Sequence, residues 1–126
     1  MKAHFILYVA DQGRSTDFYR TVLEQEPSLE APGMTEFMLG PDTVLGLMPV
    51  AGAARLLGQS IINPEHELAT ARDEVYLIVE DPAAYHLRAL AAGARELSSL
   101  AARDWGHEAA YSMDADGHVL AFAKVI

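Results

Sequence analysis

Two similar apolar segments each open on a residue that can do chemistry, His4 in the first segment and Glu74 in the second. An imidazole and a carboxylate can ligate a divalent metal, and a carboxylate in an apolar setting can act as a base or bind a cationic group. Alternate side chains of a strand share a face, so Tyr8 lies on the face of His4 and Tyr76 on the face of Glu74. These four side chains predict a small-molecule site on two matching strands.

Trp105, the only tryptophan of the chain, lies in a predicted loop beside Gly106. An indole offers a flat face that stacks on planar aromatic compounds or on cations. Tyr111 belongs to a later strand and is a further candidate for the same site. Each residue also has an ordinary interpretation: a partly buried histidine for His4, a solvated strand edge for Glu74 and a loop anchor for Trp105.

The candidate residues lie on elements that recur along the chain. Residues 4–11 align with residues 74–81 at an offset of 70, and residues 44–48 align with residues 119–123 at an offset of 75. Each copy reads as a strand, a helix and further strands, from the spacing of its apolar residues. The predicted strands cover residues 3–9, 36–39, 44–48, 74–79, 107–113 and 118–126, and the two helices begin at Ser15, as N-cap, and at Asp81-Pro82.

The tandem copies predict an α+β domain of two modules, residues 1–52 and 73–126, joined by a connection over residues 53–72. Two half-sheets each leave one face unburied, and pairing them creates a cleft between the sheets that can hold a ligand. A connection of this length is uncommon inside a small domain and often covers a functional cleft.

Composition excludes several classes of function. The 126 residues suit one domain, and 9 basic against 18 acidic residues give a net charge of −9, which argues against nucleic-acid backbones and anionic membrane surfaces. The absence of cysteine excludes disulfides, zinc–thiolate sites and thiol nucleophiles. The chain starts directly on a strand pattern and has no long apolar run, so we expect a cytoplasmic protein with neither membrane nor nucleic-acid partners.

Four short motifs follow one another along the chain: His4-x-x-x-x-Val9-x-Asp11, Ser15-x-x-Phe18-Tyr19-x-x-Val22-Leu23, Trp105-Gly106 and Asp114-x-Asp116-Gly117-His118-x-Leu120. In this order they resemble the vicinal oxygen chelate superfamily, which includes glyoxalase I, extradiol dioxygenases, fosfomycin-resistance enzymes and bleomycin-resistance proteins. The resemblance implies two tandem βαβββ modules whose curled sheets enclose a cleft, usually within a homodimer.

The resemblance also implies four positions for metal ligands, which correspond to His4, Gly46, Glu74 and Ala121. Glycine and alanine carry no ligating side-chain atoms, whereas a catalytic metal of this kind needs about three protein ligands. We therefore expect no metal and no cofactor, and extra space for a ligand beside Gly46 and Ala121.

The function predicted from these features is metal-free binding of a small aromatic or cationic, antibiotic-like compound, which the protein would sequester. In the bleomycin-resistance branch an aromatic residue at the position of Trp105 stacks on the ligand. The alternative is a lyase, isomerase or dioxygenase, with Glu74 as its base or with a metal held by His4, Glu74 and either Glu36 or His107. A role as an assembly partner is a third possibility, without direct support. The predicted ligand-binding residues are His4, Tyr8, Glu74, Tyr76, Trp105 and Tyr111.

Overall fold

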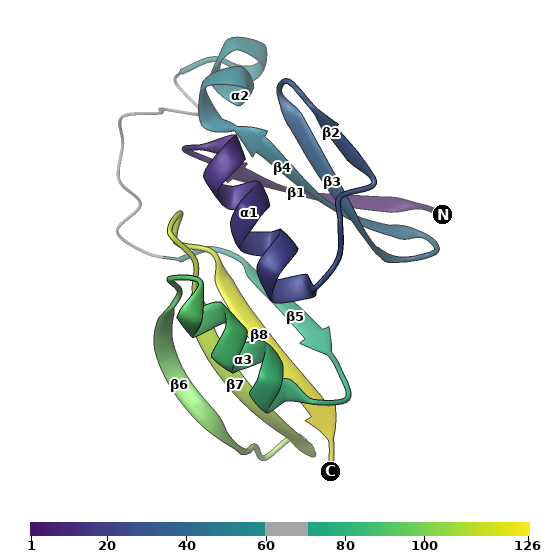
Figure 1. Ribbon diagram of the computed structural model, residues 1–126, viewed down its shortest axis with the longest axis vertical. Helices are drawn as coiled ribbons and strands as arrows, with labels where there is room; N and C mark the ends of the chain where they lie inside the picture. The colour runs from purple at the N-terminus through teal and green to yellow at the C-terminus, as the bar shows by residue number, and fades with distance from the viewer. Residues whose placement is uncertain (60–70) are drawn as a thin grey trace. The chain divides into compact units, whose positions relative to one another are not determined.

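The computed structural model describes residues 1–59 and 71–126 (Figure 1). The chain divides into two compact units, one containing the first four strands and the other the last four. Each unit is built on an open four-stranded sheet of mixed parallel and antiparallel pairing. The prediction of an α+β fold with two βαβββ modules is confirmed, while the cleft between their sheets stays a prediction.

The first module places its N-terminal strand beside its last strand. The sheet order is β1-β4-β3-β2, with β1 parallel to β4 and the other pairs antiparallel. The crossover between β1 and the rest of the sheet runs through α1 (Figure 1). The elements are β1 (Ala3–Val9), α1 (Gln12–Leu23), β2 (Leu29–Ala31), β3 (Met34–Gly40) and β4 (Thr43–Pro49).

Helix α1 begins four residues earlier than predicted. Its N-cap is Asp11, whose carboxylate accepts a hydrogen bond from the backbone N–H of Arg14 at 3.0 Å. Ser15, the predicted N-cap, lies buried inside the first turns of the helix, so that prediction is wrong. Aspartate is as strong an N-cap as serine, and it comes first along the chain.

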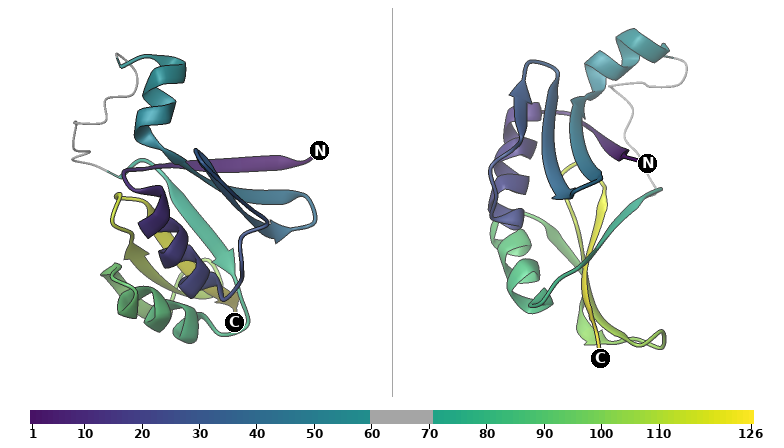
Figure 2. Two further views of the ribbon diagram at one scale, coloured as in Figure 1. Left: turned by 45° about the horizontal axis from the view of Figure 1, so that its top comes forward. Right: turned by 90° about the vertical axis from the view of Figure 1, so that its right-hand side faces the viewer.

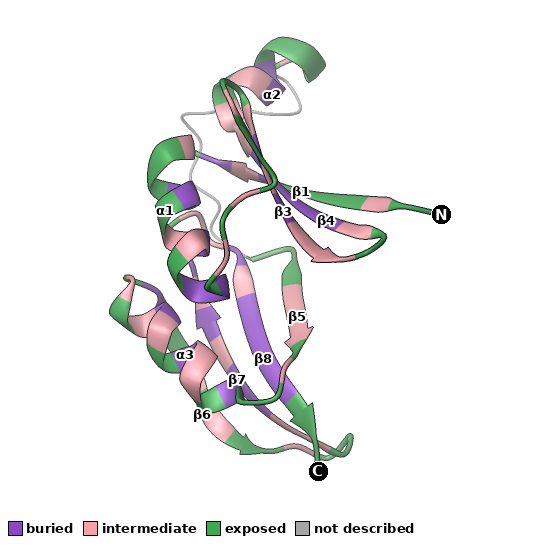
Figure 3. Ribbon diagram, turned by 45° about the vertical axis from the view of Figure 1, so that its right-hand side comes forward, coloured by how far each residue is buried: buried purple, intermediate pink, exposed green. Residues whose placement is uncertain are grey.

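The two faces of the first sheet differ in character. Alternate strand residues on one face are fully buried, and the Thr16 hydroxyl on α1 hydrogen-bonds the Thr35 hydroxyl on β3 at 2.8 Å. Burial is greatest on the central strand β4 (Figure 3). The buried side chains on this face are Leu7, Val9, Thr35, Phe37, Leu45 and Leu47, and Val44 is buried on the opposite face.

The second module repeats this plan. The sheet order is β5-β8-β7-β6, with β5 parallel to β8 (Figure 2). Asp81 caps α3 by accepting from the backbone N–H of Ala84 at 3.1 Å, and Pro82 occupies the first turn, as predicted. The elements are β5 (Glu74–Ile78), α3 (Pro82–Ala91), β6 (Arg95–Ala102), β7 (His107–Met113) and β8 (Val119–Val125).

Two elements fall outside the strands and helices predicted from the residues alone. Strand β2 has three residues, and β6 reads RELSSLAA, so neither shows an apolar alternation. Helix α2 (Val50–Leu57) starts before the predicted connection and continues into it. Residues 60–70 of that connection, including His66, lie outside the described residues. None of the helices in the described ranges is long and apolar enough to span a membrane.

Candidate ligand-binding site

Two tyrosines lie in one row across the second sheet. Tyr76 on β5 pairs in register with Ala121 on β8, and Ala121 pairs with Tyr111 on β7. Residues paired in register point to the same face, so both phenols stand on one face of the sheet with the small, buried Ala121 between them. Strand alternation predicts the orientation of Tyr76, but it leaves the face of Tyr111 open.

The hydroxyl group of Tyr76 is the centre of a hydrogen-bonded group. The indole Nε1–H of Trp105 donates to this hydroxyl oxygen at 3.0 Å, and the oxygen lies 2.7 Å from Nδ1 of His107. Because an indole only donates, the phenol O–H remains available to donate to Nδ1 of a neutral imidazole, whose proton is then on Nε2. The rings of Tyr76 and His107 are 5.8 Å apart between centroids.

Trp105 is held in place by the turn between β6 and β7. The turn includes Gly106 with φ of +85°, a conformation that residues with a side chain rarely adopt. The hydrogen bond to Tyr76 fixes the orientation of the indole, yet 52% of the residue stays exposed. An oriented, half-exposed indole is suited to stacking on a planar ligand.

Tyr111 and Glu74 are linked electrostatically. Burial raises the pKa of the Tyr111 phenol above its usual range, and the carboxylate of Glu74 raises this pKa further, as does Tyr76. The Arg103 guanidinium, 5.3 Å from the centroid of the Tyr111 ring, opposes the shift. The phenol of Tyr111 is therefore a neutral hydrogen-bonding group at physiological pH.

The equivalent face of the first module carries a different group. Nδ1 of His4 lies 3.4 Å from Oε2 of Glu36, which projects from β3. Three methionines flank this pair on alternating strand positions, which gives an adaptable apolar face. These methionines are Met34, Met38 and Met48. The half-buried Tyr8 follows on the same side of β1.

Two of the four positions that the resemblance implies for metal ligands, Gly46 and Ala121, have no ligating side-chain atom. A Cβ atom built on Gly46 would lie 3.1 Å from Cγ1 of Ile6 and 3.3 Å from Sδ of Met34, so these two side chains occupy the space above the glycine. Ala121 is buried between two tyrosines and offers no donor atom. Among residues 1–59 and 71–126, no three His, Cys, Asp or Glu side chains form a group that could hold a metal.

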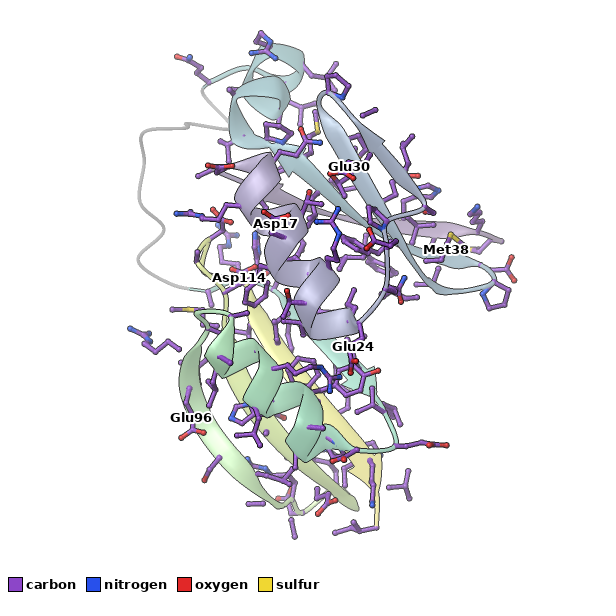
Figure 4. The ribbon with its side chains drawn as sticks, in the orientation of Figure 1. Asp17, Glu24, Glu30, Met38, Glu96 and Asp114 are labelled. Atoms are coloured by element: carbon purple, nitrogen blue, oxygen red, sulfur yellow. The ribbon has the colours of Figure 1, made fainter. Side chains whose placement is uncertain are left out.

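Two further histidines have structural partners away from the tyrosines. His86 on α3 binds Glu96 on β6 through Nε2 at 2.8 Å, and Figure 4 labels Glu96 at the β6 edge. His118 follows the turn after β7, and its Nδ1 lies 2.9 Å from a carboxylate oxygen of Asp73. Both histidines therefore have carboxylate partners within the second module.

The structure brings together Tyr76, Trp105 and Tyr111 of the predicted site, with Glu74 close enough to act on the Tyr111 phenol. His4 and Tyr8 lie on the first module. The sequence prediction considered His107 only as a metal ligand, although alternation over residues 107–113 places it on the Tyr111 face. Arg103 was missed, because its role depends on the local course of β6.

Comparison with known protein families confirms the resemblance that the sequence motifs indicated. The model of the Glyoxalase/Bleomycin resistance protein/Dioxygenase superfamily matches residues 3–122. The chain belongs to this superfamily. Comparison with curated proteins found no match.

Solved structures of this superfamily share the fold. A glyoxalase-related enzyme from Fulvimarina pelagi is 21% identical with a TM-score of 0.81, over 98% of this chain and 87% of that one. A family enzyme from Burkholderia phytofirmans PsJN is 16% identical with a TM-score of 0.82, over 98% and 97%. A glyoxalase/bleomycin resistance protein from Catenulispora acidiphila is 23% identical with a TM-score of 0.69, over 100% and 99%.

Proposed function

We propose that this superfamily member is a metal-free binding protein for a small planar aromatic compound. The ligand lies on the second sheet, against the face that carries Tyr76, Trp105 and Tyr111. The observation that carries this proposal is the half-exposed indole of Trp105, held in one orientation by its hydrogen bond to Tyr76. A pre-oriented aromatic side chain loses little conformational freedom when a ligand stacks on it.

The chemistry of the donor set supports binding without a metal. Glycine and alanine stand at two of the four ligand positions, and the groups around Tyr76 satisfy one another by hydrogen bonds instead. Glu74 and the net charge of −9 favour ligands that carry a positive group. Sequestration of an antibiotic-like aromatic compound requires only such binding, and the superfamily includes bleomycin resistance proteins.

One observation favours a second candidate function. The Tyr76 hydroxyl and Nδ1 of His107 are 2.7 Å apart and form a pair that can move a proton to or from a ligand. A metal-free isomerase or lyase would use this pair, with Glu74 as a further base. Turnover of a bound aromatic compound that is lost in His107→Gln, while binding is retained, would support this alternative.

Calorimetric titration tests the metal-free proposal. A panel of planar aromatic compounds is titrated into protein treated with EDTA and into protein supplied with zinc or nickel. We expect each compound to bind with the same affinity in both preparations, because the proposed contacts come from protein side chains and none requires a metal. The control variant is Leu87→Ala, which removes an exposed side chain from α3, away from the site. Binding that appears only with metal would reject the proposal.

A further inference from the structure

Arg103 is a half-buried cation that is held by uncharged groups. It follows the C-terminal end of β6, near a point where the pairing of β6 with β7 is irregular between Ser98 and Ala101. Its Nη2 donates to Oγ of Ser98 and to the carbonyl oxygen of Ser99, both at 2.9 Å. Nε and Nη2 both donate to the carbonyl oxygen of Ala109, at 3.2 and 2.8 Å.

These bonds fix the guanidinium, but none of them comes from a carboxylate. Within the described residues, no aspartate or glutamate forms an ion pair with Arg103, whereas Arg20 in the first module binds the carboxylates of Asp17, Glu26 and Glu30. Nη1 of Arg103 takes part in none of the bonds described above, so its two N–H donors face no protein acceptor in this part of the chain.

The guanidinium borders the aromatic group of the proposed site. It lies 5.3 Å from the centroid of Tyr111, which shares its row with Tyr76. Trp105 is two residues along the same turn and hydrogen-bonds Tyr76. The guanidinium thus covers one face of the Tyr111 ring, and a planar compound that stacks on the Trp105 indole lies near this fixed cation.

We propose that Arg103 binds an acidic group of the ligand, so that the compound is an aromatic acid. This inference rests on the proposed function and narrows its ligand class. A carboxylate oxygen accepts charge-assisted hydrogen bonds from Nη1, which are stronger than bonds between neutral groups. Arginine suits this role because its guanidinium stays charged and is already oriented by Ser98, Ser99 and Ala109. A second group of the same ligand that is positively charged would face Glu74.

Matched probes separate the acid group from the ring. Calorimetry with 2-naphthoate, 2-naphthamide and 2-naphthylmethylammonium compares an anion, a neutral group and a cation on one planar ring. We expect the carboxylate to bind about tenfold more tightly than the amide, as a hydrogen bond to a charged group implies. In Arg103→Gln the acid should lose this advantage, while the amide keeps its affinity within about twofold.

Two variants control for charge and folding. Lys124→Gln removes one positive charge from an exposed position on β8 of the same module and should leave the preference for the acid unchanged. Arg103 also binds backbone carbonyls, so Arg103→Gln is checked by circular dichroism. If it does not fold, Arg103→Lys replaces it, and we expect it to weaken binding of the acid more than binding of the amide.

The outcomes distinguish this inference from the proposed function. Equal binding of acid and amide, or tightest binding of the ammonium compound, overturns the inference and leaves the binding function standing. An acid preference that survives Arg103→Gln also overturns it. Failure of all three probes to bind at millimolar concentration rejects the binding function together with the inference.

Discussion

The indole N–H of Trp105 meets the Tyr76 hydroxyl, and the ring keeps about half of its surface exposed. An aromatic contact is worth about 0.5–1.5 kcal/mol beyond its buried area. Removal of the ring by Trp105→Ala should therefore weaken binding of a planar compound about tenfold once the lost area is included. Calorimetry measures the change.

Trp105→Phe is the matched control for that substitution. It keeps a ring but removes the N–H that bonds Tyr76, so we expect an intermediate affinity. An affinity for planar compounds that stays the same in Trp105→Ala would show that the ligand does not stack on this ring.

Tyr111 gives a prediction in the alkaline range. Its pKa is raised in the folded protein, first by burial and then by Glu74, so the phenol ionises at lower pH in the unfolded chain than in the folded one. Its contribution to stability is complete below the unfolded value of about 10 and is lost as the pH rises through the folded value. Tyr111→Phe should therefore lose less stability than wild type between about pH 9 and 11.

Thermal melts across this pH range, with Tyr85→Phe as the control on α3, measure the difference. Identical alkaline profiles for the wild type and Tyr111→Phe would contradict the role assigned to burial. Spectrophotometric titration of the phenols provides a second readout, because a phenol that ionises above the usual range of tyrosine should be missing from Tyr111→Phe.

The alternation of side chains along a strand predicted part of the candidate site from the sequence. Two-residue alternation places Tyr76 with Glu74, and the same rule links His107 with Tyr111 once their strand is known. Which face of a strand meets the helix depends on packing, and this left Tyr111 undecided. Arg103 was beyond prediction, because its partners are a hydroxyl and two carbonyl oxygens on β6 and β7, where the pairing of these strands is irregular.

At the scale of elements, the helix caps repeat between modules, with Asp11 before α1 and Asp81 before α3. Loss of such a cap typically costs about 0.5–2 kcal/mol. We expect Asp81→Ala to lower the free energy of unfolding by about 1 kcal/mol in urea denaturation. Asp81→Asn keeps an oxygen that accepts from Ala84 and should stay near wild type. An equal loss in both variants would point to charge rather than capping.

The elements that sequence reasoning found and missed differ in their burial. Strands β4 and β8 each contain a run of four buried residues, and their apolar sequences identify them. Strands β2 and β6 pair with one neighbour only, and most of their residues are exposed or half-buried. Strands β1 and β5 are also edge strands, but their apolar sequences revealed them, whereas β2 and β6 lack such a pattern and only the resemblance to the superfamily implied them.

At the scale of the whole molecule, the two modules share a topology and differ in chemistry. The row that holds Tyr76, Ala121 and Tyr111 in the second sheet corresponds to Ile6, Gly46 and Glu36 in the first. The repeat thus keeps the fold while one copy has become aromatic and the other rich in methionine. Gly46 and Ala121, the small residues at the centre of the two rows, leave room that side chains of the flanking strands can occupy.

Association is a further prediction at this scale. Unpaired strand edges favour pairing with another chain, and we expect a homodimer with two-fold symmetry. Light scattering should then give twice the chain mass of 13.7 kDa. A monomer mass at tens of micromolar protein would reject this prediction without affecting the site on the second module.

Fluorescence of Trp105 is the most direct test of the central claim that a planar ligand binds the aromatic face of the second module. Trp105 is the sole tryptophan, so its emission reports on this site alone. Titration with planar aromatic acids and with planar cationic compounds should shift or quench the emission with a saturable curve, and Tyr76→Phe should change that response by releasing the indole N–H. Emission that stays unchanged up to millimolar concentrations of every compound would contradict the account.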